Sequence, residues 1–158
     1  MTDQHLTSEK NALHMGIITA LVLMAYTGVA ALAGFLGNLA AGTLDIVLLA
    51  AGVVLSIRRL KKASGGRMSY FSGFGTGIIT ALVASGLLGG FFWLLGSISQ
   101  EAIRQIEARN LFGAELGVLI SGLGIILLGT MTGVITSLIA MQYFKKSEHG
   151  SLPELENA

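Results

Sequence analysis

Four long apolar stretches constrain the fold of this chain more than any other feature. They run Leu13–Leu36, Leu39–Ile57, Phe74–Ser97 and Leu116–Gln142. A helix needs roughly 17–25 mainly apolar residues to cross the hydrocarbon core of a bilayer. Each stretch reaches this length, so the sequence predicts four membrane-spanning helices.

The composition favours a membrane protein over a soluble one. Of the 158 residues, 53% are hydrophobic and 12% are charged, whereas soluble domains carry about twice that share of charge. The stretch Leu13–Leu36 is too long for a secretory signal peptide and lacks a clear cleavage end, so we interpret it as a mature span. The predicted fold class is an all-α membrane protein, with a four-transmembrane-helix bundle at residues 13–142. Residues 1–12 and 143–158 are predicted to be cytoplasmic tails.

The connection between the second and third stretches is basic. It contains Arg58, Arg59, Lys61, Lys62 and Arg67. Further lysines precede the first stretch and follow the fourth, at Lys10, Lys145 and Lys146. Short loops rich in lysine and arginine stay in the cytoplasm, so we expect both termini on the cytoplasmic side of the membrane. A contact with lipid headgroups or nucleic acid is the alternative interpretation, but a topology signal explains the cluster by itself. We expect the lipid bilayer as a partner and no nucleic acid.

A seven-residue segment occurs twice. GIITALV stands at residues 16–22 and again at 77–83, and Gly28 and Gly89 keep the same offset. Both copies begin near the cytoplasmic end of a helix that runs outward. The sequence therefore predicts two helical hairpins related by duplication about an axis along the membrane normal. A looser copy, GVITSLI at 133–139, lies in an inward-running helix and is attributed to similar packing needs.

Small residues recur every four positions in the third and fourth stretches. In the third stretch they are Gly73, Gly77, Ala81, Ser85 and Gly89. In the fourth they are Gly113, Gly117, Ser121, Gly129, Gly133 and Ser137, with Ile125 as the one interruption. Lipid tails are as apolar as the helices, so membrane helices associate through close backbone approach at small residues. We expect these residues to pack helices within the monomer, and a dedicated dimer face is the alternative.

Asp45 is the one ionisable residue well inside a stretch. With a rise of about 1.5 Å per residue, four hydroxyl residues reach a similar depth in the other helices. They are Tyr26, Thr27, Ser85 and Ser121. An ionisable group in the membrane is costly and suggests a functional site, while a protonated or hydrogen-bonded Asp45 that joins helices is the structural alternative. Three threonines near the inner leaflet, Thr19, Thr80 and Thr136, are expected to bond their own preceding turns.

The usual signals of catalysis and cofactor binding do not occur in the sequence. The chain has no cysteine, and its histidines, His5, His14 and His149, have no metal-binding spacing. No phosphate-binding loop ends in Lys-Ser or Lys-Thr. We therefore predict no catalytic residues, cofactor or metal. The segment Gln100–Asn110 is expected to form a short amphipathic helix on the outer surface.

The central segment carries a family resemblance. Residues 58–77 read RRLKKASGGRMSYFSGFGTG, which resembles the signature of a bacterial family of small four-span membrane proteins of unknown function. The matching features are Arg59, Gly66, Ser69–Tyr70, Gly73, Gly77 and Lys145–Lys146. The resemblance extends from about Lys10 to Lys146. It implies two helical hairpins joined by a basic loop, and it brings no catalytic residues.

Two classes of function agree with these features. The first is a non-enzymatic accessory or structural subunit that packs in a larger membrane complex or a small oligomer. The second is a small transporter of protons, cations or another solute that uses Asp45. An integral membrane enzyme is disfavoured because no acid, base, nucleophile and metal ligands converge in the pattern.

Overall fold

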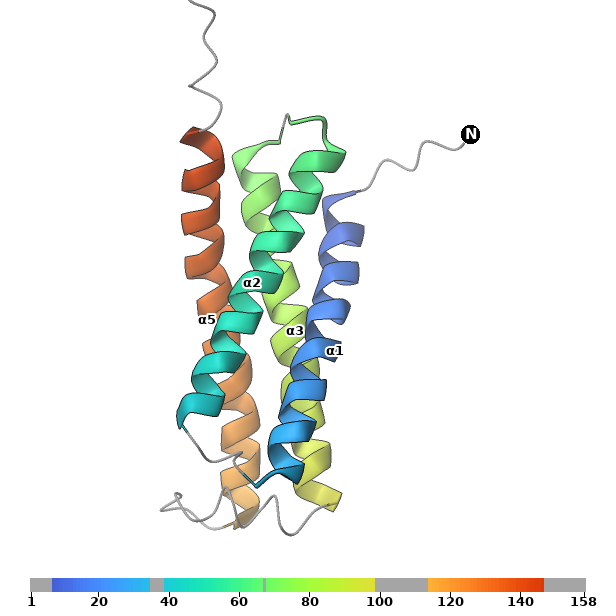
Figure 1. Ribbon diagram of the computed structural model, residues 1–158, viewed down its shortest axis with the longest axis vertical. Helices are drawn as coiled ribbons and strands as arrows, with labels where there is room; N and C mark the ends of the chain where they lie inside the picture. The colour runs from blue at the N-terminus through green and yellow to red at the C-terminus, as the bar shows by residue number, and fades with distance from the viewer. Residues whose placement is uncertain (1–6, 35–38, 67, 99–113, 147–158) are drawn as a thin grey trace, which may run out of the picture.

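The computed structural model describes residues 7–34, 39–66, 68–98 and 114–146. They form four helices, α1 (Ser8–Leu32), α2 (Leu39–Ala63), α3 (Tyr70–Ile98) and α5 (Ala114–Lys146). Successive helices run in opposite directions, so α1 and α3 point one way and α2 and α5 the other (Figure 1). The all-helical fold class is thereby confirmed for the described part of the chain. The expected surface helix at residues 100–110 lies outside the described residues. Arg67 and Gly113 lie outside them as well.

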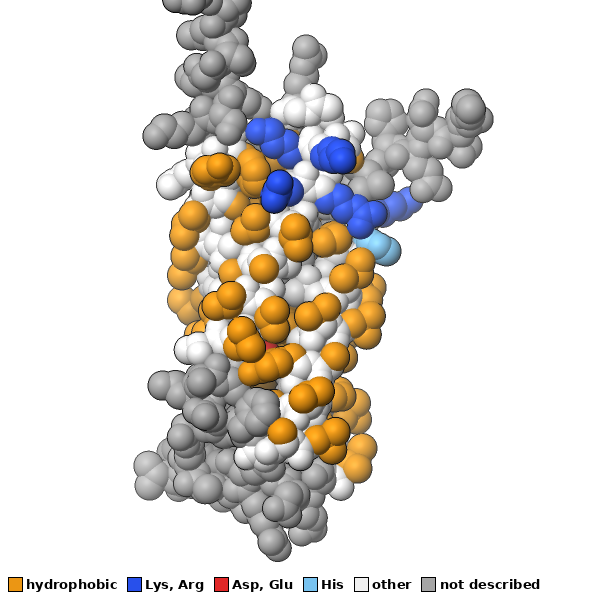
Figure 2. Space-filling view, viewed as in Figure 1, with side chains coloured by type: hydrophobic (Ala, Val, Ile, Leu, Met, Phe, Trp, Pro, Cys, Tyr) orange, Lys and Arg blue, Asp and Glu red, His pale blue; other side chains and the backbone are white. Residues whose placement is uncertain are grey.

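Three helices are long and apolar enough to cross a membrane. They are α1, α3 and the segment Leu119–Phe144 of α5. Hydrophobic side chains cover the visible face of the bundle, and Lys and Arg gather at one end (Figure 2). Leu32, for example, is 92% exposed, and soluble proteins rarely leave large contiguous apolar surfaces open to water. The helix α2 is as long as α1, but Asp45 and its basic last turn make it less apolar.

Glycines end the second helix. The backbone N–H of Gly66 donates to the Lys61 carbonyl at 3.0 Å, and that of Gly65 donates to the Lys62 carbonyl at 3.3 Å. These bonds use the carbonyls that the last turn of a helix leaves without partners. Both glycines have positive φ, 61° and 85°, which side chains with a Cβ rarely adopt. The chain can therefore turn within a few residues into α3.

The helix α3 lies at the centre of the bundle and packs against the other three. Its buried residues Ala81, Ala84 and Leu88 belong to a core that also includes Leu23 of α1 and Val53 of α2. The small side chains of α3 let the neighbouring helices approach closely. The contacts of α3 with α5 and with α1 are consequently the most extensive in the described bundle.

The closest packing joins α3 and α5. Facing pairs recur at four-residue steps along both helices: Gly73 with Met141, Gly77 with Ser137, Ala81 with Gly133, and Ser85 with Gly129. Farther along, Gly89 faces Ile126 and Gly122 faces Trp93. A β-carbon at any of these glycines would meet the facing side chain too closely to fit without a shift. The small-residue stripes of α3 and α5 therefore face one another inside the bundle.

The two copies of GIITALV lie on the adjacent parallel helices α1 and α3. A β-carbon at Gly16 would be 2.9 Å from the side chain of Val83 and 3.1 Å from the carbonyl oxygen of Thr80. Gly16 thus lies level with the middle of the second copy, whereas Gly77 faces α5. The two copies occupy different packing environments at different depths, and their origin by duplication stays a prediction.

Candidate functional site

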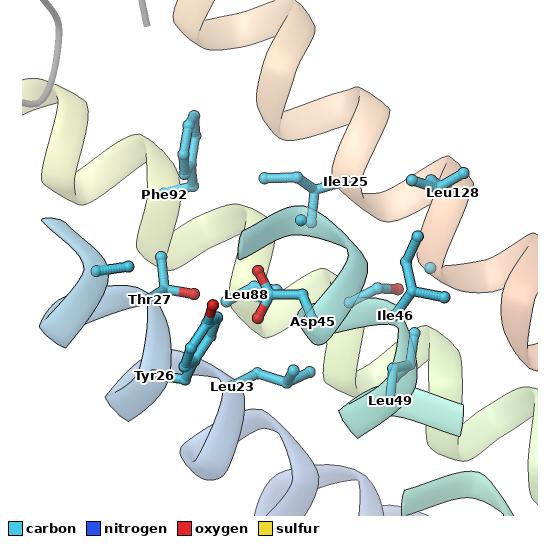
Figure 3. A pocket seen from close by; sticks show the side chains of 14 residues that line it. Leu23, Tyr26, Thr27, Asp45, Ile46, Leu49, Leu88, Phe92, Ile125 and Leu128 are labelled. Carbon is cyan, nitrogen blue, oxygen red and sulfur yellow. The ribbon is translucent and has the colours of Figure 1, made fainter. Parts of the chain in front are cut away.

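A cavity lies between all four described helices, around Asp45. Its volume is about 220 Å³. The lining residues are Leu23, Tyr26, Thr27, Ala30, Gly42, Asp45, Ile46, Leu49, Ser85, Leu88, Phe92, Ile125, Leu128 and Gly129. On α1 and α2 they follow the spacing i, i+3, i+4, i+7, which places side chains on one face of a helix. Each helix therefore presents one continuous face to the cavity (Figure 3).

The carboxyl group of Asp45 reaches into this apolar space. Asp45 lies in the second turn of α2, between the cavity-lining residues Gly42 and Leu49. Its side chain is half-buried, and its Oδ1 atom is buried with no hydrogen-bond partner among the described residues. A carboxylate in such surroundings is costly unless a donor or a positive charge pairs with it. The geometry leaves this oxygen available to a bound group.

Hydroxyl groups surround Asp45 unequally. Thr27 is 6% exposed, and its Oγ1 also has no hydrogen-bond partner among the described residues. The side chains of Tyr26 and Thr27 point toward the Asp45 carboxyl group (Figure 3). The Oγ of Ser85 instead lies 3.4 Å from the Leu82 carbonyl and 3.5 Å from the Ile126 carbonyl. Asp45 and Thr27 are thus the two lining residues with unused buried oxygens.

Of the five polar residues that were expected at a similar depth, four line this cavity. Tyr26, Thr27, Asp45 and Ser85 line it, but Ser121 does not. Ser121 lies about one helical turn from the lining residue Ile125, toward the start of α5. The rise per residue fixes depth within one helix, so it does not determine which residues of a neighbouring helix reach the cavity.

A second polar cluster was missed by the sequence reasoning. Asn11 is fully buried in α1, and its Nδ2 donates to the Ser56 carbonyl of α2 at 3.0 Å. The hydroxyls of Ser56 and Thr80 are 2.8 Å apart, and Thr80 Oγ1 lies 2.7 Å from the Thr76 carbonyl. One hydroxyl can donate once and accept twice, so this chain of bonds joins α1, α2 and α3. It was overlooked because residues 1–12 were assigned to a tail, while α1 already begins at Ser8.

Thr19 and Thr80, which lie toward the basic end of the bundle, behave differently from one another. Thr19 Oγ1 donates to the Met15 carbonyl at 2.8 Å, one turn earlier in its own helix. Thr80 also reaches its preceding turn, but it additionally contacts Ser56. The local bond expected for these two residues is therefore present. In Thr80 it belongs to an interhelical network as well.

The basic residues gather where α2 ends. Lys61 is half-buried, and its Nζ donates to the Phe144 carbonyl at 3.1 Å and lies 5.3 Å from the centre of the Phe144 ring. It therefore ties the end of α2 to the last turns of α5. Arg58, Arg59 and Lys62 are exposed. Their position at one end of the bundle agrees with contact at a membrane surface.

The packing glycines divide into closed and open positions. Gly73, Gly77, Gly89, Gly129 and Gly133 face other side chains. In contrast, a β-carbon at Gly86 or Gly90 of α3 would meet nothing within 4 Å. Gly117 lies in the first turn of α5, where the packing of the residues is not described.

The described residues contain no group of three or more His, Cys, Asp or Glu that could hold a metal ion. The cavity combines one carboxyl group, hydroxyls and apolar walls. Such a set can bind a hydrogen-bond donor or a cation, and it does not bring an acid, a base and a nucleophile together.

The described fold defines a class: a helical bundle with three helices of membrane-spanning length and composition. Comparisons of the chain with family models, with curated proteins and with solved structures gave no match.

Proposed function

We propose that this protein is a non-enzymatic accessory subunit of the bacterial inner membrane, which packs against a transmembrane helix of another subunit. In this proposal the chain crosses the membrane four times, with α2 as the fourth span and both termini in the cytoplasm. The basic end of α2 then lies at the inner surface, as short basic loops do. The family resemblance of residues 58–77 belongs to the same proposal.

The open face of α3 carries this proposal. Gly86 and Gly90 are four residues apart and have nothing within 4 Å of a β-carbon position. Exposed leucines flank them at Leu82, Leu87 and Leu94. Two small residues at this spacing let a second helix approach the backbone closely. Gly73, Gly77 and Gly89 are used inside the bundle, whereas Gly86 and Gly90 form an open pair of small residues at four-residue spacing on α3.

The mass of the intact particle tests this role. The protein would be purified from its native membrane in mild detergent, as wild type and as the double variant Gly86→Leu with Gly90→Leu. We expect a wild-type particle heavier than one chain with its detergent, and a clear loss of mass in the variant. Gly124→Leu is the matched control, because Gly124 of α5 also has nothing within 4 Å. A monomeric wild-type particle contradicts the proposal.

Transport through Asp45 is the second candidate, and the cavity favours it. A pocket that reaches an intramembrane carboxyl group is a recurrent feature of proton and cation pathways. Liposomes with wild type or Asp45→Asn at matched incorporation would be compared for pH- or cation-dependent flux. We expect flux in wild type alone, because an amide cannot titrate. Absence of flux in both excludes transport of these ions and leaves the accessory role untouched.

A further inference from the structure

We propose that the cavity around Asp45 binds one small organic cation, a primary ammonium group attached to a compact apolar body such as an aromatic ring. The inference goes beyond the accessory role and rests on the four-span membrane setting proposed above. It requires binding only, and transport of the bound molecule is a separate question.

The head of the ligand is defined by the two unused oxygens. Asp45 Oδ1 and Thr27 Oγ1 are both buried and have no hydrogen-bond partner among the described residues. Both are acceptors, and both residues line the same cavity from neighbouring helices. A primary ammonium group offers three N–H donors and a positive charge. It can therefore satisfy both oxygens and compensate the buried carboxylate together.

The body of the ligand is defined by the walls. Leu23, Leu49, Leu88, Phe92 and Ile125 surround the polar spot with apolar side chains. An apolar cavity of about 150 Å³ is large enough for benzene. The present cavity of about 220 Å³ therefore has room for one ring and a short ammonium-bearing arm.

Other occupants fit the same features less well. Ca²⁺ and Mg²⁺ take about six or more oxygen ligands, and Ca²⁺ sites usually include several carboxylates, but Asp45 is the one carboxyl group among the lining residues. A lipid acyl chain would contact the apolar walls but would leave Asp45 Oδ1 and Thr27 Oγ1 without a hydrogen-bond donor. A ligand with one charged end and one apolar end satisfies both parts of the cavity.

The ligand can enter at the edge formed by Gly42 and Leu128. Both residues line the cavity and both are exposed, Gly42 on α2 and Leu128 on α5. Figure 2 shows a small area of acidic side chain recessed among hydrophobic ones on the face of the bundle that it draws. A β-carbon at Gly42 would meet nothing within 4 Å. A larger side chain there can occupy cavity space without disturbing the packing.

Calorimetric titration of the full chain in phosphatidylcholine nanodiscs tests the proposal. The probe is benzylammonium at neutral pH, with empty nanodiscs subtracted to remove partitioning into lipid. Benzyl alcohol keeps the ring without the charge, and methylammonium keeps the head without the ring. We expect saturable binding of one benzylammonium per chain, with both analogues at least tenfold weaker.

Variants locate the binding. Asp45→Asn and Gly42→Leu are each expected to weaken benzylammonium binding at least tenfold, and Thr27→Val about threefold. Gly124→Leu adds the same bulk at an open position outside the cavity and should bind as wild type does. Circular dichroism and size-exclusion profiles would verify that every variant keeps its helices and its size.

Three results would overturn the proposal: no saturable binding to folded wild type, equal binding to Asp45→Asn, or equal binding of benzyl alcohol. The last would indicate a neutral apolar site. None of these results changes the particle mass that tests the accessory role or the labelling that tests the topology, so failure of one idea is distinguishable from failure of the others.

Discussion

Gly77 of α3 lies directly against Ser137 of α5, so that a β-carbon at Gly77 would overlap the Ser137 hydroxyl. That hydroxyl donates to the Gly133 carbonyl at 2.6 Å, within its own helix. It is thereby held against α5 and leaves space for the backbone of α3. A small side chain also faces a glycine of the other helix at Ala81 with Gly133 and at Ser85 with Gly129. The contact between α3 and α5 therefore depends on the absence of side-chain volume.

Leucine at Gly77 should weaken the bundle strongly. The added side chain has to displace Ser137 and separate α3 from α5, and overpacking of this kind costs about 1–3 kcal/mol. Unfolding in mixed detergent micelles, followed by circular dichroism, would measure the loss. Gly124→Leu should change stability by less than about 0.5 kcal/mol, because its position is open. Equal effects at both positions would show that the close contact does not stabilise the fold.

The polar cluster around Ser56 and Thr80 should contribute measurably to stability. Thr80→Val keeps the shape of the side chain and removes the hydroxyl that links Ser56 and Thr76. We expect a loss of about 1 kcal/mol, since interhelical hydrogen bonds in membranes contribute about 0.6–2 kcal/mol. Thr132→Val is the control, because its hydroxyl bonds only the Leu128 carbonyl one turn earlier among the described contacts. An equal loss of stability in Thr132→Val would mean that the hydrogen bond between Thr80 and Ser56 does not stabilise the bundle.

Asp45→Leu should leave the bundle as stable as wild type or more stable. Asp45 Oδ1 has no hydrogen-bond partner among the described residues, and leucine would fill part of an apolar cavity. Removing a carboxyl group from apolar surroundings should contribute about 0.5–2 kcal/mol. The midpoint of thermal unfolding in detergent measures the change. A clear loss of stability would instead identify Asp45 as a structural link between helices.

Labelling of introduced cysteines should place the two ends of the bundle on opposite sides of the membrane. The natural chain has no cysteine, so Ser64→Cys and Ser97→Cys would each be the single target of an impermeant thiol reagent. Both positions are exposed, beyond the end of α2 and at the end of α3. We expect Ser97→Cys to react in intact cells and Ser64→Cys to react after permeabilisation. The reverse pattern would mean that α2 does not cross the membrane or that the orientation is inverted.

The sequence by itself determined the helices, because the length and position of an apolar run are local properties. The described helices correspond to the four predicted stretches, with α1 extended back to Ser8. The depth of Asp45, Tyr26 and Thr27 was likewise predictable, since depth follows from the fixed rise of a helix.

Only the tertiary structure decided which faces meet. Gly77 and Gly86 are both glycines of α3, yet Gly77 is packed against α5 and Gly86 is open. Asn11 is buried and Ser121 does not line the cavity, and neither outcome follows from the spacing of residues within one helix. Glycines four residues apart occur both in a closed contact, at Gly73 and Gly77, and on an open face, at Gly86 and Gly90. The local pattern is the same in both places, so the packing of all the helices determines whether a glycine is closed or open.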